Sequence, residues 1–299
     1  MWDSGGDIHG TTVLIVDDDP VVGPGHDMTV SGKIYDKSVV VLVSLFNSII
    51  IEGKIDEHSN VTLRAPNGTV RIGSTLGDMD AAIDNNSQVE VAAGVDIALA
   101  SIHNSTVDFA AHGKITMGEI DFGGAMRLIS DGDIDLKGKI AGNQWDHGPS
   151  RVDFVSNMGS ITIEGKIDGQ SKVYLSAGQN IGIGVGPTQG DDDRKIDDDS
   201  VVTAIAGGNI SLGSWIRSGQ FGQTTVDLAA AGSISIAKDI SGGATVRMLS
   251  GSGTITVGDP ITDSSTTVTV WPSTLGFPRT GDTATFLRPT SGSTRRCSP

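Results

Sequence analysis

Aromatic side chains are scarce in this chain, at 4% of its 299 residues. A single globular core of this length normally contains more large rings. The scarcity, together with 41 glycines and many small aliphatic residues, favours a narrow, layered interior.

Cysteine is almost absent as well. Cys297 stands alone in a polar terminal segment, so no disulfide can form within the chain. Either the stacked layers are stable enough alone, or the compartment is reducing.

Basic residues are outnumbered, and the formal net charge is −15. Nucleic acid, anionic lipid and polyanionic glycans are therefore not expected as partners, since the only local basic feature is Arg295 and Arg296. No run approaches the ~20 apolar residues of a membrane helix, so membrane insertion is not expected. The first nine residues lack the basic and then apolar regions of a signal peptide. A trimmed mature domain would look the same, which leaves the compartment open.

What the chain does contain is a repeat. The tripeptide Gly-Lys-Ile occurs five times, and three short alternating segments recur in units of about twenty residues. Examples of the three segments are Ile49–Ile51, Ile55–Asp56 and Val61–Leu63. Period-two alternation over a few residues, bounded by Gly, Asn, Asp or Ser, predicts strands with one buried face. The copies of the tripeptide begin at Gly32, Gly53, Gly113, Gly138 and Gly165, of which the Gly113 copy is out of step with the rest.

Coils of three strands stack as a parallel β-solenoid, in which each segment pairs with its equivalent one coil away. The chain lacks the aliphatic residue at every sixth position that a left-handed hexapeptide solenoid requires. We therefore predict an all-β fold: a single right-handed parallel β-helix of about eleven three-stranded coils. It spans residues 12–270, with an N-terminal cap or arm at 1–11 and a C-terminal cap and flexible tail at 271–299.

Three repeats carry a resemblance. They are Gly-Ser-Ile-Thr-Ile-Glu-Gly at 159–165, Gly-Asn-Ile-Ser-Leu-Gly at 208–213 and Gly-Ser-Ile-Ser-Ile at 232–236. These rows resemble the repeats of filamentous-haemagglutinin-type secreted adhesins and, more loosely, the pectate-lyase-like β-helix superfamily. The resemblance implies a right-handed β-helix and assigns no catalytic residue.

Departures from the repeat are where function is expected, because regular coils of a solenoid mainly build the scaffold. Insertions at 142–150 and 218–223 enlarge the same corner about three coils apart. Aromatic and ionisable residues gather in and beside them, which predicts a ligand groove with tryptophan faces for sugar stacking. The alternative is that the two tryptophans only cover the sheet beneath the loops. The candidate ligand-binding residues are Trp145, Arg151, Trp215, Arg217 and Phe221, and the catalytic candidates are Asp146, His147 and Asp168.

Aspartate recurs in one slot of the third segment, with His103, Ala141 and Arg217 interrupting the row. Two carboxylates stacked in adjacent coils at ~5 Å would raise one pKa and could act as an acid–base pair. The alternative is that each aspartate only bonds nearby backbone amides in a turn. The row consists of Asp56, Asp84, Asp121, Asp168 and Asp197.

Two further patterns bear on possible functions. Asp191, Asp192 and Asp193 form a dense carboxylate cluster of the kind that gathers calcium, although their spacing matches no calcium loop, and no other cofactor is expected. Ice binding would require a flat ladder of small groups. The expected outward slot of the second segment is interrupted by Arg71, Asp96 and Asp135.

The sequence thus favours a structural or binding module, at the cell surface or secreted, that recognises a neutral glycan or a protein. A carbohydrate-active enzyme of the glycoside hydrolase or transferase type, with carboxylates on the flank of the β-helix, is the alternative. Whether the chain is an enzyme stays open at this point. Rods of this kind often pack side by side or end to end, so a homo-oligomer is expected.

Overall fold

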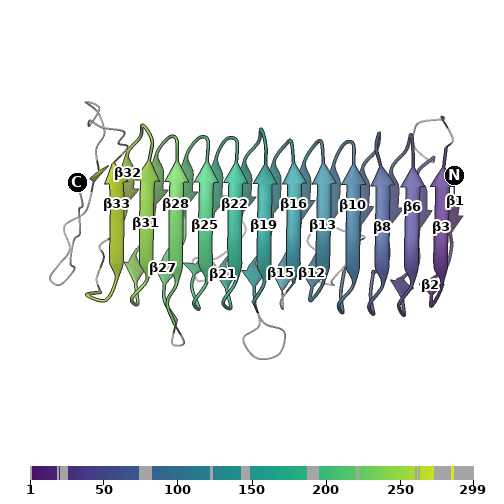
Figure 1. Cartoon of the computed structure of the whole chain (residues 1–299), viewed down its shortest axis with the longest axis horizontal. Helices are drawn as coiled ribbons and strands as arrows, with labels where there is room; N and C mark the ends of the chain where they lie inside the picture. The colour runs from purple at the N-terminus through teal and green to yellow at the C-terminus, as the bar shows by residue number, and fades with distance from the viewer. Residues whose placement is uncertain are drawn as a thin grey trace.

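The computed structural model describes residues 2–18, 20, 26–73, 83–121, 124–142, 149–186, 195–219, 222–259, 261, 263–272 and 284–285. Within these ranges every regular element is a β-strand, and no helix is long and apolar enough to cross a membrane. The strands wind into one rod, a parallel β-solenoid of about ten turns with three sheets (Figure 1). The predicted all-β solenoid and its three-stranded coil are confirmed.

The first sheet has 12 strands of six residues each, and each strand pairs in parallel with the equivalent strand of the adjacent turn. In all but the terminal strands, the second, fourth and sixth residues face the interior and are buried. The strands are β3 (Thr12–Asp17), β6 (Val39–Ser44), β8 (Asn60–Ala65), β10 (Gln88–Ala93), β13 (Thr106–Ala111), β16 (Ala125–Ser130), β19 (Arg151–Ser156), β22 (Lys172–Ala177), β25 (Val201–Ala206), β28 (Thr225–Ala230), β31 (Thr245–Ser250) and β33 (Thr267–Pro272).

The second sheet has 13 short strands, most of which bury their first and third residues. These strands are β1 (Trp2–Ser4), β4 (Met28–Val30), β7 (Ile49–Ile51), β9 (Val70–Ile72), β11 (Ile97–Leu99), β14 (Ile115–Met117), β17 (Ile134–Leu136), β20 (Ile161–Ile163), β23 (Ile181–Ile183), β26 (Ile210–Leu212), β29 (Ile234–Ile236), β32 (Ile255–Val257) and β34 (Ala284–Thr285).

The third sheet is the narrowest and has seven strands. Isolated bridges through Ile55 and Ile83 connect it to a further pair, β2 (Ile8–His9) and β5 (Ile34–Tyr35). The three faces of the rod are therefore continuous over most of its length. The seven strands are β12 (Ile102–His103), β15 (Ile120–Asp121), β18 (Ile140–Ala141), β21 (Ile167–Asp168), β24 (Lys195–Ile196), β27 (Trp215–Arg217) and β30 (Ile240–Ser241).

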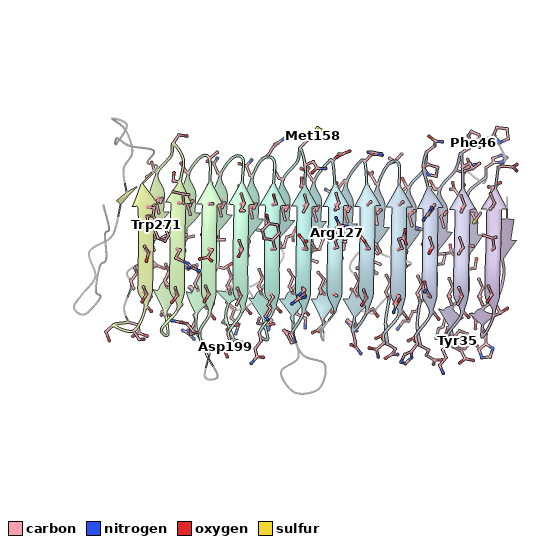
Figure 2. The ribbon with its side chains drawn as sticks, viewed as in Figure 1. Tyr35, Phe46, Arg127, Met158, Asp199 and Trp271 are labelled. Carbon is pink, nitrogen blue, oxygen red and sulfur yellow. The ribbon has the colours of Figure 1, made fainter. Side chains whose placement is uncertain are left out.

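The coil is right-handed, as predicted. In Figure 1 the strands of the first sheet point upward on the near side, and the chain then passes over the top to the far side. It advances from the N-terminus at the right to the C-terminus at the left with each circuit. In Figure 2, Phe46 and Met158 mark the edge where the chain leaves the first sheet, and Tyr35 and Asp199 mark the opposite edge.

Like side chains stack in files inside the rod, because each strand pairs in register with its equivalent in the next turn. The third sheet contributes an almost unbroken file of isoleucine, and ten of its members, from Ile34 to Ile240, are fully buried. Phe109 and Phe154 are the largest fully buried side chains and lie in the file of the first sheet. This interior is the layered, aromatic-poor core that the composition predicted.

The register explains why glycine opens the recurring tripeptide. A Cβ on Gly53 would lie 2.2 Å from the carbonyl oxygen of Gly32 in the preceding turn, and one on Gly165 would lie 2.5 Å from that of Gly138. A side chain has no room where two turns of backbone approach so closely. At the out-of-step Gly113, a Cβ would instead meet Asp96 and Val95 at another corner of the coil.

The corner between the third and first sheets has its own recurring structure. A buried serine or threonine precedes most first-sheet strands, and before six of them its hydroxyl donates to a carbonyl of the third segment, as when Ser59 Oγ donates to Asp56 O at 2.7 Å. Many of these corners also hold a pair of residues with positive φ. The pairs Glu57–His58 and Asp198–Asp199 are examples. The turns at these corners thereby fix the positions of the third-segment aspartates, such as Asp56 and Asp197, that precede them.

The structure differs from the sequence prediction in three places. Residues 2–9, expected to be a cap or arm outside the repeat, supply β1 and β2, which pair with β4 and β5. In the second sheet, Ala98 and not Asp96 occupies the outward slot between Arg71 and Thr116. At the other end, β33 continues through Trp271 to Pro272, beyond the closing strand that the pattern predicted.

Candidate functional site

The third sheet carries a file of polar side chains immediately after its buried isoleucines. The row of aspartates predicted from the sequence is present in the expected order, interrupted at the expected places. Parallel register places His103 beside Asp121, and the pairing of Ile167 with Ile196 places Asp168 beside Asp197. From β2 to β30 the file reads His9, Tyr35, Asp56, Asp84, His103, Asp121, Ala141, Asp168, Asp197, Arg217 and Ser241.

Lysines precede several of the buried isoleucines and form ion pairs with three of these carboxylates, two within one turn and one, Lys139 with Asp121, between adjacent turns. Lys139 Nζ lies 2.6 Å from Asp121 Oδ2, and Lys195 Nζ lies 2.7 Å from Asp197 Oδ2. Lys166 contacts Asp168 in the same way. The three carboxylate side chains are at most 10% exposed, whereas the lysines are about one-third exposed. The result is a ladder of largely buried ion pairs along the third face, which we call the Lys–Asp ladder.

Asp168, Asp197 and Asp198 form one cluster in this ladder, with carboxylate oxygens all within 4.8 Å of one another. Burial raises the pKa of Asp197, and the nearby Asp198 and Asp168 raise it further against the opposing effect of Lys195. Asp197 Oδ1 is buried and has no hydrogen-bond partner among the residues that the structure describes. Two carboxylates of adjacent turns, those of Asp168 and Asp197, therefore lie close together.

A second cluster lies nearer the N-terminus and contains an imidazole. His103 Nε2 lies 3.7 Å from Glu119 Oε1, and one ligand atom of each residue lies within 4.8 Å of a carboxylate oxygen of Asp121. The Glu119 carboxylate beside it raises the pKa of His103, and His103 in turn lowers the pKa of Glu119. The two side chains are 21% and 18% exposed, so solvent reaches them only partly.

Trp215 and Arg217 continue the ladder toward the C-terminus. Trp215 occupies the lysine slot, in register with Lys195, and Lys238 Nζ lies 5.9 Å from the centre of its ring. Arg217 follows Asp197 in the polar file and is exposed. A half-buried indole beside cations and carboxylates has one apolar face and several polar neighbours, which suits a sugar ring.

The structure brings together some of the predicted site residues and separates others. Asp168, Trp215 and Arg217 lie on one face within about three turns. Arg151 begins β19 on the first sheet, where it is exposed between Ala125 and Lys172, so it belongs to a different face. The remaining candidates lie outside the described residues: Trp145, Asp146, His147, Phe221, Asp191, Asp192 and Asp193.

Sequence reasoning missed the lysines of the ladder. A signal was present, because the tripeptide Lys-Ile-Asp occurs at 54–56, 166–168 and 195–197. In a strand, residues on either side of a buried isoleucine share the opposite face and can form an ion pair. The aspartate slot alone does not reveal the pairing, which requires the lysine two positions earlier to be placed on the same face.

A shallow groove of about 480 Å³ lies away from the ladder, on the outer surface of the first sheet. It exists because two alanines, Ala92 and Ala110, occupy consecutive outward positions between the larger Arg64 and Ile129. Among the described residues, no phenylalanine, tyrosine or tryptophan lines it. It is therefore a weaker candidate for a glycan than the surface around Trp215.

Comparisons with known proteins do not extend these observations: no family model, no curated protein and no solved structure matches the chain.

Proposed function

We propose that the chain is a β-helical binding module that recognises a neutral glycan through the third face, around Trp215 and the Lys–Asp ladder. The observation that carries the proposal is the placement of the indole in the lysine slot at the end of the ladder. The indole supplies a stacking surface. The ammonium groups beside it can donate hydrogen bonds to sugar hydroxyls, and the carboxylates can accept hydrogen bonds from them.

The charge balance of this face supports a neutral ligand. Lys166 and Lys195 are each matched by a carboxylate, so the ladder offers neither a positive nor a negative field to a distant ligand. A polyanionic glycan would meet buried carboxylates, and the net charge of −15 opposes it further. Neutral hexose or pentose chains avoid both costs.

The repeats that resemble filamentous-haemagglutinin-type adhesins support a place at the cell surface or outside the cell, and we include that location in the proposal.

The proposal also includes self-association of the rods. Leu14 and Val16 on the outer side of β3 are 69% and 57% exposed, so the N-terminal end offers apolar surface to another copy. Sedimentation velocity of the chain would show whether it is monomeric.

The binding test uses isothermal titration with neutral oligosaccharides such as cellohexaose, xylohexaose and maltohexaose. Loss of ring stacking in Trp215→Ala should weaken binding about tenfold, and Trp215→Phe should retain most of it. Ala110→Gln fills the groove of the first sheet and should leave binding unchanged. If Trp215→Ala still binds the oligosaccharide and Ala110→Gln does not, the binding site is the groove and not the surface around Trp215.

The second candidate function is glycoside hydrolysis or transfer by Asp168 and Asp197. Their carboxylate oxygens lie within 4.8 Å, close to the separation of about 5–5.5 Å between the two carboxyls of retaining glycosidases, and the pKa of Asp197 is raised as an acid catalyst requires. Release of reducing sugar that disappears in both Asp168→Asn and Asp197→Asn would establish the enzyme. Binding without any release favours the module.

A further inference from the structure

The cluster of His103, Glu119 and Asp121 differs in its chemistry from the rest of the Lys–Asp ladder. His103 follows the buried Ile102, and Asp121 occupies the same slot one turn later. Glu119 precedes Ile120, in the slot that lysine occupies in three later turns. An imidazole nitrogen and two carboxylates from adjacent turns thus converge, with one ligand atom of each within 4.8 Å of the others.

The spacing of these atoms fits a small divalent ion with modest closure. Zinc binds histidine nitrogen at about 2.0–2.1 Å and carboxylate oxygen at about 2.0–2.2 Å, so neighbouring donors in a tetrahedral site lie about 3.4 Å apart. His103 Nε2 and Glu119 Oε1 are 3.7 Å apart. A shift of a few tenths of an ångström in either side chain would bring this pair to that separation, and Asp121, whose ligand atom lies within 4.8 Å of both residues, would have to move by at most about 1.4 Å.

Charge in the surroundings also favours a cation. Asp84 precedes His103 in the polar file, so carboxylates lie in the turn before the imidazole and in the turn after it. Lys139 is the ammonium that contacts the cluster, through Asp121 Oδ2 at 2.6 Å. A carboxylate can hold a metal through one oxygen and a hydrogen-bond donor through the other, and such outer partners orient the ligand.

The other acidic cluster offers a poorer site. Two of its three carboxylates, those of Asp168 and Asp197, already contact the ammonium groups of Lys166 and Lys195. It contains no nitrogen donor, and calcium would need about six to eight oxygen ligands. A metal there would have to displace two resident cations, so the cluster around His103 is preferred.

We propose that His103, Glu119 and Asp121 bind a divalent first-row transition metal, and that Zn²⁺ fits them best. One imidazole and two carboxylates make a donor set that zinc, cobalt and manganese accept, and three protein ligands leave the fourth position to water or to a bound molecule. Because His103 and Glu119 retain 21% and 18% exposure, solvent can supply that fourth ligand. This site shares Asp121 with the Lys–Asp ladder but lies four turns before Trp215, so the two sites can be tested by separate variants.

The test is calorimetric titration of the full chain with Zn²⁺ after treatment with a chelator, together with Co²⁺ absorption spectra that report the coordination. His103→Ala and Glu119→Gln should each weaken binding by about 100-fold or more, since changing even an outer-shell partner of a ligand costs about 10–100-fold. The intense visible bands of tetrahedral Co²⁺ should be lost in the same variants.

His112→Ala is the matched control. His112 Nδ1 also contacts a carboxylate, that of Asp131 at 2.8 Å, but its side chain is 78% exposed and no third ligand joins the pair among the residues that the structure describes. Binding retained in His112→Ala and lost in His103→Ala, with unchanged circular dichroism, supports the site. If His103→Ala unfolds, Glu119→Gln alone decides. The absence of Zn²⁺ binding by the parent protein, or equal binding by parent and Glu119→Gln, overturns the proposal.

Discussion

Replacing Gly165 by alanine should destabilise the protein by about 2–4 kcal/mol, although the change adds only one methyl group. The new Cβ would lie 2.5 Å from the carbonyl oxygen and 2.7 Å from the carbonyl carbon of Gly138 in the preceding turn. Ordinary contact begins at 3.4 Å, so the two turns would have to separate by about 0.9 Å. Backbone atoms, unlike a flexible side chain, cannot rotate out of the way.

Two costs contribute to this magnitude. Overpacking that moves backbone typically costs about 1–3 kcal/mol. The same movement stretches the bond from Gly165 N to Gly138 O, now 3.1 Å, beyond hydrogen-bonding distance, which costs about a further 0.5–1.5 kcal/mol. Gly165 has negative φ, so no backbone strain adds to these two terms.

Urea denaturation followed by circular dichroism would measure the effect, with Gly5→Ala as control. A Cβ at Gly5 meets nothing within 4 Å, so that variant should stay within about 0.5 kcal/mol of the parent. Equal stabilities of Gly165→Ala and Gly5→Ala would refute the close approach of successive turns. The explanation of the Gly-Lys-Ile repeat would then fail too.

Three further outcomes are expected. Phe154→Ala should lower the unfolding free energy by about 3–5 kcal/mol because the ring is fully buried, whereas the outward Thr162→Ala should change it by less than about 0.5 kcal/mol, both measured by urea midpoints. Because burial raises the pKa of Asp197, the folded carboxyl holds its proton more tightly than the unfolded one. Its contribution to stability is therefore present below the ordinary aspartate pKa of about 4 and is lost as pH rises through the raised pKa. A pKa of Asp197 at or below the ordinary value, measured by carbon NMR titration, would contradict this. Arg247→Ala removes an exposed ion pair with Asp227 and should cost less than about 1 kcal/mol, an amount that shrinks with added salt.

Much of the fold could be predicted because a stacked coil repeats its signals. The alternation in Ile161–Ile163 and the isoleucine before each polar slot occur so often that errors at one turn do not disturb the rest. The same repeat spacing places Asp121, Asp168 and Asp197 in that order in one file. Single turns were less secure, as the outward slot of β11 shows, where Ala98 stands two residues beyond the expected Asp96.

The remainder could not be predicted because it depends on contacts between turns. The segments Trp2–Ser4 and Ile8–His9 are too short to show a period, and only their pairing with the next turn makes them strands. The contact between His103 and Glu119 joins residues 16 positions apart through a corner whose length varies from turn to turn. Neither residue belongs to a motif, so only the stacked structure brings them together.

The parallel stacking of equivalent strands also bears on how such a chain can change in length. Among the described strands, each pairs with its counterparts in the turns directly before and after it, and no sheet closes back on its own first strand. Nothing in the geometry therefore sets how many turns the rod has. Duplication or deletion of one unit of about twenty residues would leave every remaining pairing intact, so a gene of this kind can lengthen or shorten by whole units while the polar face keeps its spacing.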